Sequence, residues 1–263
     1  MKIHKLNSIK YLTLDSFDKE GIKHGFFTRH GGVSPMPWKS MNLSTTVGDS
    51  KENVVKNRIR ILSALELEIN GFFDVWQIHS TEVIVANKPR GNDEIYFQAD
   101  AVICATPKVT LLMRFADCVP ILLFDSKNKV IGLIHSGWMG TLNQIAKATV
   151  NKMEEVFGSN PNDIIAGIGP SISVDHYEIG PDVVEKTRNV FPKVWRKFID
   201  QKRDKNYLDL WKANSLILNN AGVNKIEIAN ICTACNTMDW YSHRGEGGKT
   251  GRFGAVISLS ENN

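Results

Sequence analysis

The sequence lacks any apolar run of the length that a membrane-spanning helix requires, so we expect no membrane partner. Its first residues, MKIHKLNSIKYLTLDSF, have charged and polar residues interspersed throughout, and they therefore lack the continuous apolar core of a signal peptide. Cysteine is also scarce, with four residues in 263. In a chain without an export signal, these four residues predict reduced thiols and a cytoplasmic location.

A strong charge imbalance is also missing. The 32 Lys and Arg residues against 28 Asp and Glu residues give a net charge of +4, and the basic residues are scattered along the chain. A nucleic-acid-binding surface needs a concentrated basic patch, so we expect no nucleic-acid partner. A small anion such as phosphate would still be attracted to a pocket lined by backbone N–H groups.

No Pro- or Ser-rich linker, low-complexity tract or internal repeat divides the chain. With 42% hydrophobic residues, a sequence of this length can bury a large core. We therefore predict one compact domain over residues 1–263, and we interpret the polar stretch 196–206 as a surface loop within it. The sequence leaves the oligomeric state open.

Two kinds of pattern interleave irregularly along the chain, which indicates a mixture of strands and helices. Segments rich in β-branched and aromatic residues predict strands at residues 24–28, 81–86, 109–115, 121–124, 130–135, 164–168, 225–231 and 254–259. Apolar residues at helical spacing predict helices at residues 54–65, 141–157, 181–190 and 209–221. Gly158 and Gly222 are placed to end the second and the fourth of these helices.

Residues 126–129 are typical of the turn of an antiparallel hairpin that joins residues 121–124 to residues 130–135. In antiparallel pairing, a residue just before the first strand lies opposite the end of the second strand. The hairpin would then bring Cys118 close to His135.

Three short strings carry residues of the kind that bind transition metals: WQIHS with His79, RFADCVP with Cys118 and LIHSGWMG with His135. Two imidazoles and a thiolate suit a borderline-soft ion such as zinc, and three protein ligands leave a position open for water or substrate. Taken singly, however, a Cys between strands is more often a buried apolar residue, and a lone His is more often structural.

The order of motifs resembles that of the laccase-domain family over nearly the whole chain. The matching strings are FFTRHGGVS (26–34), MNLS (41–44), VGD (47–49), NR (57–58), QIHS (77–80), QADAV (98–102), ADCVP (116–120), HSGW (135–138), GPSI (169–172), YEIG (177–180), CT (232–233) and YSHRGEGGKTGR (241–252). So many matches in the same order make the resemblance specific.

The resemblance implies a fold, a metal and an activity. Members of this family were first called multicopper polyphenol oxidases and were later understood as purine nucleoside phosphorylases with adenosine deaminase activity. The implied fold is α+β, a mixed-sheet αββα layered sandwich. The implied metal is zinc, or else copper, held by His79, Cys118 and His135 as the catalytic residues. The implied partners are phosphate and purine nucleosides such as adenosine, inosine, guanosine and methylthioadenosine.

Three positions depart from the family's usual pattern. Met139 follows the Gly–Trp pair where Arg is common, Ser171 follows Gly–Pro where Cys is common, and Phe115 stands where Thr usually precedes Ala–Asp–Cys. If the missing Arg contacts an anion in other members, then phosphate affinity or the balance between the two reactions differs in this chain.

Two aspartates are candidates to support the metal ligands. Asp100 and Asp117 lie near them in the sequence, and a carboxylate that accepts a hydrogen bond from a ligating imidazole orients the ring and fixes its tautomer. The alternative for each is an ordinary aspartate at a turn or strand end.

Two Gly-rich loops carry basic residues, Arg29 beside Gly31 and Gly32, and Arg244 in the string RGEGGKTGR. A flexible backbone with a guanidinium group suits phosphate or ribose hydroxyls, so we expect Arg29 and Arg244 to bind substrate, with surface turns as the alternative. The string GEGGKTG is not an ATP-binding P-loop, because the first Gly of that motif would fall at His243 and no apolar strand precedes it.

Cys232 and Cys235 form a single CxxC pair. Without a second pair nearby they are a weak indication of structural zinc, and no thioredoxin-like context suggests a redox role. We expect both to be buried thiols near the edge of a sheet.

The resemblance therefore implies a metal-dependent enzyme that cleaves purine nucleosides with phosphate and also deaminates adenosine. A cysteine hydrolase with Cys118 as nucleophile and His135 as base is the main alternative, since the fold resembles that of a bacterial toxin that deamidates glutamine with a Cys and His pair. A copper polyphenol oxidase is another, although multicopper centres draw on more His ligands than the seven present here. A catalytically silent protein would bind nucleosides without turnover.

Overall fold

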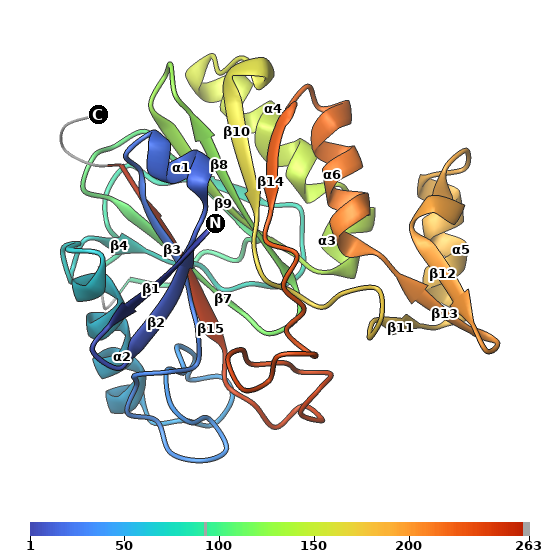
Figure 1. Cartoon of the computed structure of the whole chain (residues 1–263). Coiled ribbons are helices and arrows are strands. Elements are labelled where there is room, and N and C mark those ends of the chain that lie inside the picture. The colour runs from blue at the N-terminus through green and yellow to red at the C-terminus, as the bar shows by residue number, and fades with distance from the viewer. Residues whose placement is uncertain (92–93, 260–263) are drawn as a thin grey trace.

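Two six-stranded sheets pack face to face and form the body of the protein (Figure 1). The computed structural model describes residues 1–91 and 94–259. The first sheet has the order β1-β2-β3-β15-β7-β4, with β1 (Lys2–Leu6), β2 (Ile9–Thr13), β3 (Lys23–Phe27), β15 (Phe253–Ser258), β7 (Thr110–Phe115) and β4 (Phe72–Phe73). The second has the order β14-β10-β8-β9-β6-β5, with β14 (Lys225–Ile228), β10 (Ile164–Ile168), β8 (Val119–Asp125), β9 (Val130–Ser136), β6 (Ala101–Cys104) and β5 (Val83–Val85).

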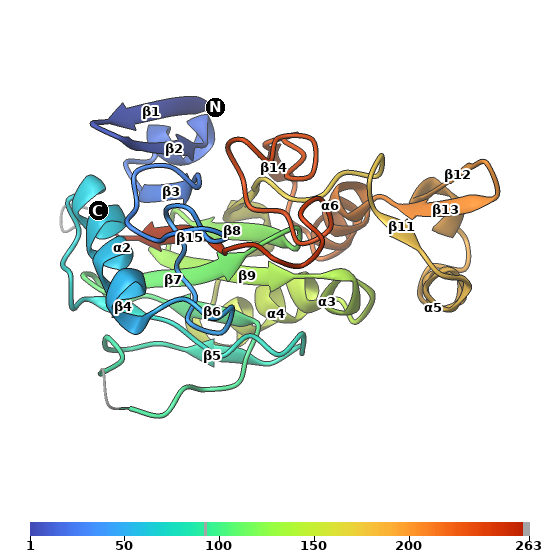
Figure 2. The ribbon, with the colours of Figure 1, turned by 90° about the horizontal axis from the view of Figure 1, so that it is seen from below.

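Helices cover the outer face of each sheet (Figures 1 and 2). Helix α2 (Lys51–Ala64) packs on the first sheet, and α3 (Trp138–Leu142), α4 (Ile145–Phe157) and α6 (Leu210–Asn220) pack on the second. The short α1 (Asp15–Lys19) joins β2 to β3, and the 3₁₀ turn η1 (Pro161–Asp163) leads into β10. Both sheets mix parallel and antiparallel pairs. The predicted α+β fold with αββα layers is confirmed.

Alternation of side chains along the strands explains these layers. In β8, Leu122 and Phe124 point into the core between the two sheets, whereas Ile121 and Leu123 pack in the cluster that contains Ile145 of α4. Strand β7 divides its side chains in the same way between the inter-sheet core and the cluster under α2. Because both faces are buried, the central strands have nearly continuous apolar sequences.

Three of the four predicted helices are present with small shifts at their ends. Helix α2 begins three residues early because the Ser50 side chain accepts a hydrogen bond from the Asn53 N–H and caps it. Helix α5 (Pro181–Val190) has the predicted bounds. Asp209 caps α6, and Gly222 beyond its end adopts a φ of 92°. None of the helices in the described part of the chain is both long and apolar enough to cross a membrane.

The prediction of one helix over residues 141–157 is wrong. Gln144 has a left-handed φ of 61°, which a helix does not accommodate, so α3 ends at Leu142 and α4 begins at Ile145. Within α4, Ile145, Ala146, Thr149, Val150 and Met153 form a buried stripe, whereas Val156 near its end is exposed.

All eight predicted strands are present, whereas β1, β2, β4, β6 and the strands of a third sheet were not predicted. The interpretation of residues 196–206 as a loop is wrong. This stretch includes the end of the 3₁₀ turn η2 (Trp195–Lys197) and most of a hairpin formed by β12 (Ile199–Lys202) and β13 (Lys205–Leu208). With β11 (Glu178–Ile179), the hairpin forms a third sheet of order β11-β13-β12. Its polar side chains face solvent, while Phe198 and Leu208 join the core cluster that covers the second sheet. The hairpin, which projects from the body of the protein in Figure 1, therefore shares the hydrophobic core of the second sheet.

The predicted hairpin is confirmed and sets the position of the site. Strands β8 and β9 pair antiparallel with Pro120 opposite His135, so Cys118 lies just beyond the end of β9. At the other end, Asp125 accepts hydrogen bonds from the N–H groups of Lys127 and Asn128 and closes the turn. Since β7 belongs to the first sheet and β8 to the second, Cys118 lies where the chain passes between the sheets.

Candidate metal centre and active-site cavity

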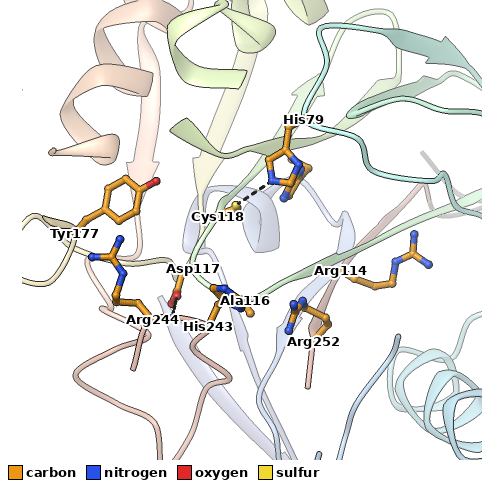
Figure 3. Close-up of a pocket in the computed structure, with 10 residues that line it drawn as sticks. His79, Arg114, Ala116, Asp117, Cys118, Tyr177, His243, Arg244 and Arg252 are labelled. Carbon is orange, nitrogen blue, oxygen red and sulfur yellow. Dashed lines mark hydrogen bonds between the residues drawn. The ribbon is translucent and has the colours of Figure 1, made fainter. Parts of the chain in front are cut away.

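The structure brings the three predicted ligands together. The donor atoms of His79, Cys118 and His135 all lie within 4.8 Å of one another. The Cys118 Sγ is 3.9 Å from Nε2 of His79, and the two imidazole rings meet edge to face with their centroids 4.9 Å apart. Three groups from separate loops and strands thus point at one small volume. Figure 3 shows the His79 ring and the Cys118 sulfur turned toward each other.

The backbone near two of the ligands adopts an uncommon conformation. His79, in the loop between β4 and β5, has a φ of 61°, and Asp117, directly before Cys118, has a φ of 84°. Left-handed residues other than glycine are destabilising by about 1–3 kcal/mol and persist where surrounding contacts hold them, often at functional sites. The conformation turns His79 and Cys118 toward His135.

Asp100 supports both histidines. Its Oδ1 accepts a hydrogen bond from Nδ1 of His135 at 2.8 Å, and its Oδ2 accepts from the backbone N–H groups of Ile78 and Ser80, at 3.1 Å and 2.6 Å, which flank His79. Because a carboxylate accepts and does not donate, Nδ1 of His135 carries the proton and Nε2 is left for the centre. This is the geometry expected of a carboxylate that orients a metal-binding imidazole, the role predicted for Asp100.

The two buried ligands shift each other's pKa. Burial alone raises the pKa of the Cys118 thiol, but the charge and hydrogen bond of His135, with a contribution from His79, outweigh burial and lower it to about 6. Burial lowers the pKa of His135, but the Cys118 thiolate and the Asp100 carboxylate outweigh this and raise it to about 9. At neutral pH Cys118 is therefore a thiolate, the form that binds metals.

The donor set fits a metal ion. Two imidazoles and one thiolate suit zinc or copper, and a buried carboxylate behind one imidazole is the usual support for such a ligand. Gly137 adds a steric condition, because a Cβ there would lie 2.9 Å from the Cys118 Sγ and 3.0 Å from the His79 ring. Only glycine lets the backbone after β9 approach the ligands this closely.

Asp117 does not contact the imidazoles. Its carboxylate, which is buried, accepts hydrogen bonds from the Thr233 hydroxyl at 2.7 Å and from the backbone N–H of Arg244 at 2.6 Å. Asp117 therefore ties the Cys118 turn to the loop between β14 and β15, and the structure gives it a positioning role.

A cavity of about 330 Å³ opens beside the three ligands, lined by His79, Arg114, Ala116, Asp117, Cys118, His135, Tyr177, His243, Arg244 and Arg252. In Figure 3, Tyr177 and Arg244 lie on one side of Cys118, and Arg114 and Arg252 lie on the other. A second hollow of about 240 Å³ shares His79, His135, Arg114 and Arg252 and extends toward Trp76. The candidate centre therefore lies at the junction of two compartments.

Three guanidinium groups give this cavity a positive charge. Within the described residues, the guanidinium of Arg252 donates hydrogen bonds to the carbonyls of Thr250 and Gly251, at 3.2 Å and 2.9 Å, and it forms no direct ion pair, although the charges of Cys118 and Asp117 lie near it. That of Arg244 likewise donates to the carbonyls of His176 and Glu178. Neither guanidinium forms an ion pair with a carboxylate of the described residues, so the half-buried Arg252 and the exposed Arg244 are both suited to an anionic ligand.

Arg114 is held differently from the other two. Its guanidinium donates to the Val75 carbonyl and to Oε1 of Gln77 at 3.3 Å, and it lies 3.6 Å from the buried Asp74 carboxylate. Arg58 and Arg90 contact the same carboxylate. Asp74 thus anchors Arg114 at the cavity wall.

Arg29, the other predicted substrate residue, does not line the cavity. Its guanidinium donates to the Thr237 carbonyl at 2.6 Å, forms an ion pair with Glu246 at 2.9 Å and stacks over Tyr241. Glu246 in turn accepts hydrogen bonds from the Ser242 N–H and the Thr250 hydroxyl. Arg29 therefore supports the loop that carries Arg244.

The three departures from the family pattern lie outside the cavity lining. Met139 lines a separate hollow with Trp138 and Lys186. Ser171 is buried and accepts a hydrogen bond from the Trp211 indole at 2.5 Å. Phe115 packs behind the site, with its ring centroid 5.5 Å from that of His135.

The expectation for the CxxC pair is wrong in part. Cys232 is buried as predicted, but Cys235 is exposed, because it lies in the turn that follows the bridge of Cys232 with Ser171.

Sequence reasoning missed Arg114 and His243 and did not assign a role to Tyr177, whereas it placed Arg252 in the same basic Gly-rich loop as Arg244. A signal for Arg114 was present, since it is the one charged residue in the apolar string TLLMRFA, and an arginine within a buried strand needs partners. His243 and Tyr177 reach the cavity from loops, where local sequence offers no such signal.

Comparison with known proteins agrees with this geometry. The family model described as multi-copper polyphenol oxidoreductase laccase matches residues 23–260. A protein of Deinococcus radiodurans named purine nucleoside phosphorylase is 36% identical over 238 residues, which cover 90% of this chain and 89% of that protein. The purine nucleoside phosphorylase YlmD of Bacillus subtilis is 35% identical over 246 residues, with coverage of 90% and 88%. Among solved structures, YlmD from Geobacillus stearothermophilus has a TM-score of 0.91 at 31% identity and covers 98% of each chain.

Proposed function

The chain belongs to the multi-copper polyphenol oxidoreductase laccase family, and we propose that within this family it is a metal-dependent purine nucleoside phosphorylase. The reaction joins a phosphate oxygen to the anomeric carbon of the ribose and breaks the bond from that carbon to the base. The electron pair of the broken bond goes to the purine, which takes up a proton. Adenosine, inosine, guanosine and methylthioadenosine are the proposed substrates, and ribose 1-phosphate or its methylthio derivative is the second product.

One observation carries this proposal. The candidate ligands His79, Cys118 and His135 open onto the same cavity as Arg244 and Arg252, whose guanidiniums have carbonyl partners and remain able to bind an anion. A reaction between a neutral nucleoside and phosphate needs an anion site next to the group that acts on the base. The names of the relatives support the same substrate class.

We assign roles to the residues on this basis. His79, Cys118 and His135 would hold a zinc ion, or a copper ion in its place, and such an ion would act as a Lewis acid that acidifies water and stabilises developing negative charge. Arg252 and Arg244 bind phosphate and orient it toward the sugar. Arg29 keeps the Arg244 loop in place through Glu246.

A second reaction, hydrolysis of the amino group of adenosine to inosine and ammonia, is proposed for the same cavity. Three protein donors leave a coordination position for water, and zinc-dependent deamination of adenine uses water activated in this way. Arg244 and Arg252 would not be required for this reaction, since no phosphate takes part.

The rival cysteine hydrolase also has an observation in its favour. Without a metal, Asp100, His135 and Cys118 form a series in which a carboxylate orients an imidazole beside a thiolate. Against it stands His79, because a Cys–His–Asp arrangement does not need a second imidazole 3.9 Å from the sulfur.

The test is product analysis of purified protein with adenosine, with and without phosphate, before and after removal of metal by a chelator. We expect adenine and ribose 1-phosphate with phosphate, inosine without it, and neither product after chelation. Replacing His79, Cys118 or His135 by Ala should remove bound metal and both activities together. Full phosphorolysis by metal-free His135→Ala protein would overturn the proposal, and activity that resists chelation but is lost to a thiol reagent would favour the hydrolase.

We also propose a cytoplasmic location. All four cysteines are unpaired, which supports a reducing compartment.

A further inference from the structure

A second group of metal-binding side chains lies outside the cavity. His176, Cys232 and Cys235 place their donor atoms within 4.8 Å of one another. The Cys235 Sγ is 3.4 Å and the Cys232 Sγ is 3.8 Å from the same Nδ1 of His176. The sequence reveals only the CxxC pair, because His176 comes from a segment far away in the chain.

Two facing turns create this arrangement. After its parallel bridge with Ser171, Cys232 begins a turn in which the Asn236 N–H donates to the Cys232 carbonyl at 3.2 Å, and this turn places both sulfurs on one side. In the opposite segment the His176 N–H donates to the Ser173 carbonyl at 3.1 Å and directs the imidazole back toward the sulfurs. The two segments, between β10 and β11 and between β14 and β15, run together in Figure 1.

The distances match a tetrahedral ion. With Zn–S bonds of about 2.3 Å and Zn–N bonds of about 2.0 Å, sulfur and nitrogen ligands of one zinc ion lie roughly 3.5 Å apart. The two S–N distances, 3.4 Å and 3.8 Å, lie on either side of this value. A hydrogen bond explains one of these contacts but not both, since a single ring nitrogen has one proton or one lone pair to share.

The cluster also has support behind one ligand. The backbone N–H of Ser173 donates to the Cys232 Sγ at 3.3 Å, an interaction that stabilises a thiolate. Cys232 is buried, whereas His176 and Cys235 are exposed, so the fourth coordination position faces solvent. The nearest carboxylate in the sequence, Asp175, pairs with Lys202 at 2.9 Å, which leaves that position to water.

We propose that His176, Cys232 and Cys235 bind a second metal ion of the zinc class, separate from the ion at His79, Cys118 and His135. Its role is to hold two walls of the cavity together. His176 directly precedes Tyr177, which lines the cavity. The His176 carbonyl accepts a hydrogen bond from the Arg244 guanidinium at 3.3 Å. Thr233, next to Cys232, binds the Asp117 carboxylate at 2.7 Å. An ion at this position would therefore position Tyr177, Arg244 and Asp117 without touching the substrate.

The test counts metal ions in protein purified under reducing conditions, dialysed and loaded with zinc. We expect two zinc ions per chain in the wild type, one in Cys118→Ser, one in Cys235→Ser and none in the double variant. If Cys235→Ser folds poorly, His176→Gln replaces it in the test, because His176 is also an exposed ligand of the cluster, and this variant should likewise bind one zinc ion. Cys104→Ser is the matched control, because Cys104 belongs to neither cluster, and it should keep two ions.

A spectroscopic measurement identifies the ligands without relying on enzyme activity. Cobalt(II) bound to Cys118→Ser should show thiolate charge-transfer absorption from two sulfurs, and that absorption should be lost in the double variant of Cys118→Ser with Cys235→Ser. A chelator should lower the Tm of Cys118→Ser but not of the double variant. One zinc ion in the wild type and none in Cys118→Ser would overturn the proposal. So would a Cys232–Cys235 disulfide that persists in reduced, zinc-loaded protein, whatever reaction the first site catalyses.

Discussion

Asp100 and His135 are joined twice, once through their side chains and once through their backbones. The carboxylate accepts a hydrogen bond from Nδ1 of His135 at 2.8 Å, and the Asp100 carbonyl accepts one from the His135 N–H at 2.7 Å. The register between β6 and β9, with Ala101 opposite Ile134, places the two residues side by side. One carboxylate thereby fixes the tautomer and the orientation of a candidate ligand.

Asp100→Asn should weaken metal binding by about 10- to 100-fold, the range found when a residue that orients a metal ligand is changed. An amide in this position no longer carries the charge that favours the protonated Nδ1 of His135. The measurement is zinc affinity by competition with a chelator. Asp125→Asn is the control, since Asp125 is a buried carboxylate that binds backbone N–H groups in a remote turn. Equal zinc affinities in the two variants would contradict the assigned role of Asp100.

Gly137→Ala should lower zinc affinity at the first site by at least about tenfold, a loss typical of displaced ligand support. The added Cβ would lie 2.9 Å from the Cys118 Sγ and must displace it or the His79 ring. The φ of −74° is open to alanine, so the effect is steric and not a backbone strain. In Gly140→Ala the nearest atom is a methyl group of Ile145 at 3.2 Å, so this control should keep its metal. A Gly137→Ala protein with wild-type affinity would show that the ligands do not meet as described.

Zinc affinity at the first site should rise with pH. Cys118, with a pKa of about 6, is already a thiolate at neutral pH, whereas His135 keeps its proton up to a pKa of about 9. Between neutral pH and about 9 the ion must displace one proton from His135, so affinity should increase about tenfold per pH unit and level off above that range. Competition titrations in Cys235→Ser protein isolate this site. An affinity that is constant between neutral pH and about 9 would show that His135 is not protonated in the free protein.

Arg252→Gln should raise the KM for phosphate by about 10- to 100-fold, because a hydrogen bond to a charged group contributes about 1.5–3 kcal/mol. Zinc content should not change. Arg29→Gln serves as the comparison, since Arg29 pairs with Glu246 away from the cavity, and it should reduce stability more than phosphate affinity. If Arg252→Gln had an unchanged KM for phosphate and Arg29→Gln a raised one, the anion site would have to be placed at Arg29. Adenosine deamination without phosphate should survive Arg252→Gln.

Much of the fold could be predicted from local sequence. The β8–β9 hairpin, the apolar strands and the capped helices α2, α5 and α6 depend on residues close together in the chain. Where prediction failed, contacts from elsewhere decided the conformation. The Ser136 hydroxyl, for example, binds Asn214 of α6 at 2.8 Å, and Asn214 also binds Thr141, so α3 is held at the end of β9 and separated from α4 at Gln144.

The candidate ligands were recognisable as residue types and motifs, because thiolate and imidazole chemistry is a property of the side chains themselves. Their convergence and their environment were decided by the packing of the two sheets, which brings the His79 loop, the Cys118 turn and the end of β9 to one seam. The same applies to Arg252, whose guanidinium reaches the cavity with carbonyl partners and without a direct ion pair among the described residues, and to His176, which lies beside the CxxC pair. Charge, pKa and coordination depend on distances of a few ångströms between residues far apart in the chain, and such distances exist only once the tertiary structure has formed.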